Sequence, residues 1–376
     1  MVTFPKNSKV NVTMKMIRHS NATAGGNIVP NAESTSIQLL GFKNATVKGG
    51  APRARVSAYK VLWPEKNEEA MELNLGKGSA MDMLAGFDAA ISDGVDIINL
   101  SIEGPISQNY FEDVMSIGSF HAMMNGFLLL LVRQIVDQAL VVLKTLPLGC
   151  SLSYCMPESL DPVKVKGKIL ICLVANAGSI DERLSKSEIA DKFEAPDVIA
   201  PGSSIMAAFS EAPNATMFPG NLEHNLGRSM AAPHVAAIAA LLRKVHPDWS
   251  VSAIKSAIMT TARPRDKTEK PLVDDDMVHE STPFSFGAGL VQPNLAMDPG
   301  LVYDMNQYDY LNFLCAQHYN ATTIKIFSEK HDYKCPESFS LNDFNYPSIV
   351  VTEFSESVTV TRKLKNVGQP GTYTAR

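Results

Sequence analysis

One short stretch of this chain combines a serine with the surroundings that an acyl-transfer nucleophile needs. Gly227 and Arg228 precede Ser229, and residues 230–242 are mostly small and apolar. Apolar residues on every side predict a buried helix. A serine at the N-terminus of such a helix lies where backbone N–H groups and the helix dipole favour negative charge. Because the tetrahedral intermediate of acyl transfer carries an oxyanion, Ser229 is the candidate catalytic nucleophile.

The residues around Ser229 also match a motif. The sequence GRSMAAPHV at 227–235 closely resembles the nucleophile motif G-T-S-M-x-x-P-H-V of subtilisin-like serine proteases, and the match continues through 238–250 and 253–262. This longer stretch is similar to the plant subtilases of the cucumisin-like type. The resemblance implies a secreted serine endopeptidase with an Asp/His/Ser mechanism. Arg228 stands where the family has threonine.

The general base of the family has no counterpart at its expected position. Aligning residues 24–27 with the end of the family motif G-H-G-T-H-T-x-S-T-A-A-G-N places Met16 on the catalytic histidine and His19 on the second, non-catalytic one. A methionine thioether does not take up a proton at any useful pH. A shifted register in which His19 serves as the base is the alternative. His234 lies about 7.5 Å along the helix from Ser229 on a different face, so we expect it to be packed or hydrogen-bonded.

The other catalytic parts are replaced as well. The family carboxylate lies on a strand before the histidine motif, but the eighteen residues before His19 contain no Asp or Glu, and the first acid is Glu33. Ile135 aligns with the asparagine that donates to the oxyanion, and its side chain has no donor. Glu103 stands where a family glycine lets the substrate backbone pair, so we expect it to hinder β-pairing of a peptide.

Composition excludes several classes of protein. A net charge of -5 and a pI near 5.9 argue against a nucleic-acid partner. The chain has no run of 18 apolar residues, which argues against a membrane span; the run from Phe127 to Val132 is interrupted by Arg133. The sequence shows no metal-ligand cluster and no phosphate loop, so we predict no metal and no cofactor. The oligomeric state stays open.

Strands and helices alternate in the first third of the chain. Residues 56–62 are expected to form a strand, and Ser79 to cap a helix with Asp82 three residues on. The helix should end at Asp93-Gly94, and residues 95–102 form an apolar run typical of a buried parallel strand. The inward-facing residues of the helix are expected to be Leu84, Phe87 and Ile91.

This β-α-β pattern predicts an α/β fold. With the resemblance, it predicts a subtilisin-like parallel-sheet sandwich with helices on both faces. Residues 150–174, including the stretch 159–172, resemble the start of a protease-associated domain, and a period-two pattern at 358–364 resembles a fibronectin-III-like domain. We expect the N-terminal part of the catalytic domain at 1–145, a protease-associated remnant at 146–192, the C-terminal part of the catalytic domain at 193–340, and a truncated fibronectin-III-like domain at 341–376.

Cysteines and glycosylation sequences bear on the compartment. The resemblance implies disulfides between Cys155 and Cys172 and between Cys315 and Cys335; free buried thiols are the alternative if the chain stays in the cytosol. The N-terminus lacks the apolar core of a signal peptide, yet the resemblance implies an extracellular or cell-wall protein. The Asn-x-Ser/Thr sequences begin at Asn11, Asn21, Asn44, Asn99, Asn214 and Asn320, and Asn99 is expected in a buried strand.

Three functions remain in competition. The first is an active serine endopeptidase that cleaves peptide or protein substrates. The second is a non-catalytic relative that binds peptides or protein partners through the remaining cleft. The third is a truncated gene product, with internal losses at 132–145 and 175–193, that folds poorly. Because Ser229 is the one catalytic residue that the sequence retains, we expect an impaired peptidase.

Overall fold

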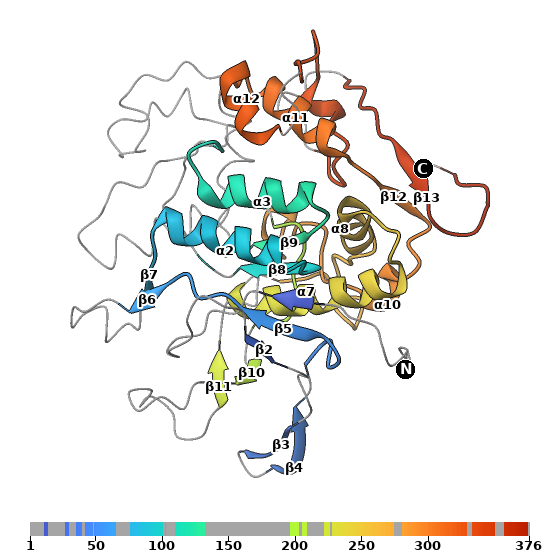
Figure 1. The fold of residues 1–376 in the computed structure, drawn as a ribbon. Helices are drawn as coiled ribbons and strands as arrows, with labels where there is room; N and C mark the ends of the chain where they lie inside the picture. Colours follow the sequence, from blue (N-terminus) through green and yellow to red (C-terminus); the bar gives the residue numbers. More distant parts are fainter. Residues whose placement is uncertain are drawn as a thin grey trace, which may run out of the picture.

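The computed structural model describes the chain in several stretches (Figure 1). These are residues 11–13, 27–29, 35–39, 42–47, 49–64, 76–100, 102, 110–131, 196–202, 205–208, 222–225, 228–273, 280–328, 333–349 and 357–374. The predicted protease-associated remnant at 146–192 lies outside them, as do Cys155 and Cys172.

A five-stranded sheet forms the centre of the fold. Its strands, in spatial order, are β2 (Asn27–Val29), β5 (Arg55–Ala58), β1 (Asn11–Thr13), β8 (Ile97–Leu100) and β9 (Leu128–Leu131). The last four run parallel to their neighbours, and β2 runs antiparallel to β5. The predicted parallel α/β sheet is therefore confirmed.

Helices cover both faces of this sheet, as predicted. The helices α2 (Ala80–Ser92) and α3 (Val114–Met124) pack with Ile98 and Leu100 of β8 in one apolar core. The helices α7 (Arg228–Val245) and α8 (Val251–Thr260) pack with Ile97 of β8 in another. Since successive side chains of a strand point to opposite faces, the single strand β8 contributes to both cores.

The predicted caps of α2 are confirmed, and its buried stripe is shifted. Ser79 and Asp82 form a reciprocal capping box, and Gly94 turns the chain with a φ of 67° after the helix. Phe87 is 1% exposed as expected, but Leu84 and Ile91 are only half-buried. The buried positions are Met83, Gly86, Phe87 and Ala90. Gly86 and Ala90 are small, so they let α2 approach the neighbouring layer more closely than Leu84 and Ile91 would.

The packing of α2 on α3 depends on a glycine. A Cβ atom at Gly118 of α3 would lie 2.3 Å from the ring of Phe87, so only glycine fits there. The strand expected at 56–62 is shorter than predicted, because β5 ends at Ala58. Tyr59 and Val61 are nevertheless buried in the same core, and the chain then turns into a small hairpin.

The small sheets and the C-terminal third complete the described elements. The hairpins pair β3 (Thr35–Leu39) with β4 (Phe42–Val47), β6 (Trp63–Pro64) with β7 (Gly76–Lys77), and β10 (Ile205–Ala208) with β11 (Leu222–Asn225). The later elements are α9 (Pro283–Phe286), α10 (Pro293–Ala296), β12 (Leu301–Tyr303), α11 (Gln307–Ala316), α12 (Ala321–Phe327), the 3-10 helix η2 (Leu341–Asp343) and β13 (Leu364–Asn366).

The C-terminal residues lie against the rest of the chain. The strand β13 pairs antiparallel with β12, and a disulfide joins Cys315 to Cys335, which confirms that predicted pair. The period-two pattern at 358–364 becomes a strand only at its last residue. Before that residue, the backbone hydrogen bonds are made with side chains. Asp343 accepts from the N–H of Thr361 at 2.6 Å, and Arg362 donates to carbonyl oxygens.

Candidate active site

The helix α7 presents Ser229 as its second residue. The helix packs against β1, β8 and β9, and Ala239 and Leu242 are fully buried, which confirms the predicted buried helix. It begins two residues earlier than the apolar run and includes Pro233, which is exposed near its start. Of Ser229 and Arg228 the structure describes the backbone and not the side chains.

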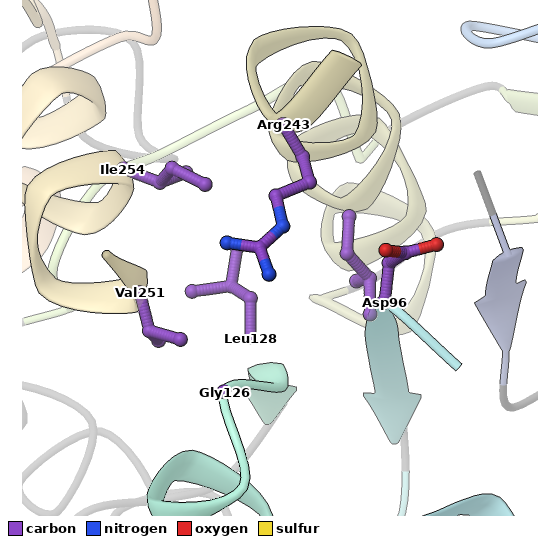
Figure 2. Close-up of a pocket in the computed structure, with 7 residues that line it drawn as sticks. Asp96, Gly126, Leu128, Arg243, Val251 and Ile254 are labelled. Carbon is purple, nitrogen blue, oxygen red and sulfur yellow. The ribbon is translucent and has the colours of Figure 1, made fainter. Parts of the chain in front are cut away.

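The direction of α7 places Ser229 at one particular edge of the sheet. At its C-terminal end, Arg243 lies beside Asp96 and Gly126, which come just before β8 and β9 (Figure 2). The fourteen residues from Arg243 back to Ser229 rise by about 21 Å, and a four-residue strand spans about 13 Å. The N-terminus of α7 therefore reaches past the carboxyl ends of the strands, where open α/β sheets bind their ligands.

Three adjacent strands of the sheet end at this same edge. The strand β1 ends at Thr13, β8 at Leu100 and β9 at Leu131, and these strands are adjacent and parallel. Met16, Glu103 and Ile135 follow those ends by three or four residues and lie outside the described residues, as does His19.

His234 has the role that its position predicts. Its Nδ1 donates to the carbonyl oxygen of Met230 at 2.9 Å, one turn earlier on the same helix, and its side chain is half-buried. This bond turns the imidazole toward its own helix. The expectation of a hydrogen-bonded histidine is confirmed.

The opposite end of α7 holds a shallow hollow that is not a ligand site. Figure 2 shows the Arg243 side chain extending from α7 toward Leu128, with Val251 and Ile254 of α8 beside it. The hollow has no room for a water-sized molecule. Arg243 Nη1 donates to the carbonyl oxygen of Trp249 at 2.8 Å, so the guanidinium group links α7 to the residues just before α8.

Sequence reasoning missed a charged cluster beside α8. Lys255 Nζ lies 2.9 Å from Asp197 Oδ2 and 4.5 Å from the centre of the Tyr346 ring, and the Tyr346 hydroxyl donates to Asp197. Burial lowers the pKa of the Lys255 ammonium, but its interactions with Asp197, Tyr346 and Tyr310 together outweigh burial, and the net pKa is raised. Burial and the Asp197 charge raise the pKa of the Tyr346 phenol. The sequence signal that could have revealed this cluster is Lys255 itself, a charged residue within an otherwise buried helix.

Among the described residues, no group of three or more His, Cys, Asp or Glu side chains is arranged to hold a metal ion. No helix in that part of the chain has the length and apolar character needed to cross a membrane.

Comparison with known protein families gives a match over more than half of the chain. The sequence profile of the subtilase family matches residues 18–289. The chain belongs to the subtilase family. The family accounts for the subtilisin-like fold, with its parallel sheet and helices on both faces.

Plant proteins are among the relatives of this subtilase. It is 34% identical to Subtilisin-like protease SBT5.4 of Arabidopsis thaliana, over 95% of this chain and 62% of the relative, and 32% identical to SBT5.3 of the same plant, over 95% and 63%. The chain thus spans less than two thirds of their length. The matched stretch covers 498 positions, more than the 376 residues of this subtilase, so the relatives contain internal segments that it lacks.

Solved structures give weaker likenesses. The Prenylagaramide maturation protease PagA matches with 18% identity and a TM-score of 0.38, over 69% of this chain and 78% of that one. Fervidolysin from Fervidobacterium pennivorans, a keratinolytic enzyme related to subtilisin, matches with 17% identity and a TM-score of 0.38, over 68% and 34%. Superposition at this level carries no argument about the site.

Proposed function

We propose that this subtilase is a serine endopeptidase by descent that retains Ser229 alone of its catalytic group and does not cleave peptides at a physiological rate. The observation that carries the proposal is the common edge of β1, β8 and β9. The segments that follow these strands are the ones in which Met16, Glu103 and Ile135 replace the family residues.

The first function lost in this proposal is removal of the proton from the Ser229 hydroxyl. The nucleophile of a serine peptidase needs a base within hydrogen-bond reach and a carboxylate that orients it. Met16 supplies no base, and His234 is bonded to its own helix through Nδ1. The sequence from the start of β1 to His19 contains no carboxylate to orient a histidine. A serine hydroxyl without a base stays protonated and is a weak nucleophile.

Binding of the substrate and of the oxyanion is weakened as well. Ile135 offers no donor, which leaves the backbone N–H at Ser229 as the remaining oxyanion contact. The side chain and charge of Glu103 oppose strand pairing by a peptide. Arg228 adds a long cation beside the nucleophile.

Magnitudes measured on subtilisin itself, not on this chain, rank these losses. There, loss of the serine or the histidine costs about 10⁶ in turnover, and loss of the remaining triad members adds little. Loss of the oxyanion asparagine costs about 10² to 10³. A chain without base, acid and asparagine is therefore expected to hydrolyse peptides only at a weak background rate.

The organisation and location of the protein belong to the same proposal. Residues 1–145 and 193–340 form the two parts of the catalytic domain, 146–192 a protease-associated remnant and 341–376 a fibronectin-III-like segment. The substrates of the ancestral activity are peptides or proteins. The Cys315–Cys335 disulfide supports an extracellular or cell-wall location, since disulfides persist in oxidising compartments.

Labelling with a fluorophosphonate probe tests the proposal directly. The purified chain is treated with the probe beside Ser229→Ala, and cooperative thermal unfolding is recorded for both. We expect no labelling that depends on Ser229 in a sample that unfolds cooperatively. Labelling that disappears in Ser229→Ala would overturn the proposal, because it requires an assembled base and oxyanion site.

A peptide titration then separates the remaining functions. If the folded, unlabelled chain binds a peptide library with measurable affinity, the protein is a pseudoprotease that acts by binding. If the sample aggregates without a cooperative transition, it is a product that does not fold well.

A further inference from the structure

Two of the Asn-x-Ser/Thr sequences differ in their exposure to solvent, a difference that the amino-acid sequence alone does not show. Asn99 lies in β8 between two helical layers and is 9% exposed, which confirms the predicted buried strand. Asn320 is exposed, and so are Ala321 and Thr322, the other residues of its sequence. An oligosaccharide is bulky and hydrophilic, so it fits the second position and not the first.

The local geometry leaves the acceptor atom of Asn320 accessible. Asn320 is the N-cap of α12: its Oδ1 accepts from the backbone N–H of Thr323 at 2.9 Å and from the Thr323 hydroxyl at 3.1 Å. Both bonds use the oxygen, and the nitrogen Nδ2 takes no part in them. A group attached to Nδ2 would therefore leave both hydrogen bonds of the cap intact.

We propose that Asn320 is an N-glycosylation site. In the transfer, Asn320 Nδ2 forms a bond to C1 of an oligosaccharide carried on a lipid diphosphate. The bond from C1 to the diphosphate oxygen breaks, the lipid diphosphate leaves, and the proton from Nδ2 is lost to solvent. No oxidation takes place.

Two features of the fold are compatible with this site. The sequence lies inside the loop closed by the Cys315–Cys335 disulfide, which belongs to the oxidising route that N-glycosylation shares. The helix α12 packs on α3, on the face of the sheet opposite α7 (Figure 1). A glycan there leaves the N-terminus of α7 uncovered. The inference rests on the proposed extracellular location and not on the state of Ser229.

Translation with microsomes tests whether Asn320 is glycosylated without depending on how the protein reaches its natural compartment. The full chain is given a signal peptide and translated with microsomes, and molecules inside the lumen are selected by their resistance to added protease. Endoglycosidase H then trims each glycan to one N-acetylglucosamine, which mass spectrometry of peptides locates. We expect this mass on the Asn320 peptide and not on the Asn99 peptide.

Three variants separate loss of the acceptor from loss of the cap. Asn320→Asp removes the amide but keeps a side-chain oxygen that caps α12 equally well, and Thr322→Ala removes the hydroxyl that transfer requires. Both are expected to abolish the mass on this peptide, and Thr322→Ser to retain it. An unmodified Asn320 peptide in protease-protected wild-type chains would overturn the proposal, and so would a glycan on Asn99.

Discussion

The two ends of α7 are built differently, although they belong to one helix of eighteen residues. At the C-terminal end, Leu242 is fully buried, Arg243 is bonded to the Trp249 carbonyl, and His246 stacks on Trp249 at 3.9 Å. The N-terminal end holds Ser229, the nucleophile whose catalytic partners we propose to be replaced. The comparison teaches that the residues that build a scaffold are separable from those that perform chemistry on it.

Truncation of the packed end should have the largest effect on stability. Leu242→Ala is expected to lower the free energy of unfolding by about 2–5 kcal/mol, because it leaves a cavity where α7 meets the sheet. Urea denaturation measures the loss, with Val245→Ala, an exposed position on the same helix, as the control. A loss below about 1 kcal/mol would remove the contrast between the two ends.

The tyrosine that fastens residues 341–349 to α8 should come next. Tyr346→Phe removes the hydrogen bond to Asp197 while keeping the ring over Lys255. Hydrogen bonds to charged groups contribute about 1.5–3 kcal/mol, and the partial exposure of Asp197 puts the expected loss at the lower end. Tyr373→Phe, at an exposed tyrosine, is the control for denaturation. Equal losses in both variants would mean that the cluster adds nothing.

The same cluster predicts a response to alkaline pH. The pKa values of Lys255 and Tyr346 are raised in the folded chain above their ordinary values of 10.5 and 10.0. Their contribution to stability is therefore complete below those ordinary values and is lost as the pH rises through the folded values. We expect the unfolding temperature to fall above about pH 10 and to fall less steeply in Tyr346→Phe. Parallel curves for the two proteins would contradict this assignment.

The cap of α8 should have a smaller effect. Ser250 Oγ accepts from the N–H of Ala253 at 2.9 Å and donates to Asp304. Ser250→Ala is expected to cost about 1 kcal/mol in urea denaturation, and Ser250→Thr to recover most of it. A Thr variant as unstable as the Ala variant would show that the cap is not the cause.

The smallest effect is expected at the other end of α7. Ser229→Ala should change the free energy of unfolding by less than about 0.5 kcal/mol, since alanine is the better helix former. Differential scanning calorimetry of both proteins measures this. A loss above about 1.5 kcal/mol would mean that the Ser229 hydroxyl caps the helix.

Local sequence patterns correctly predicted the two helices α2 and α7. The spacing of Ser79 and Asp82 gave the start of α2, and the apolar run after Ser229 gave α7. The strand at 56–62 was overestimated, because alternation of side chains does not show where β5 leaves the sheet. The cluster of Asp197, Lys255 and Tyr346 joins residues far apart in the chain, and no local pattern connects them.

The sequence by itself determined the family and predicted the nucleophile Ser229 and the replacement of its catalytic partners, because motifs and residue types are properties of the chain. Only the tertiary structure decided that β1, β8 and β9 are adjacent in one sheet, that His234 bonds to its own helix, and that Asn99 is buried while Asn320 is exposed. Burial and proximity depend on how distant segments pack, and the order of residues along a chain does not contain that information locally.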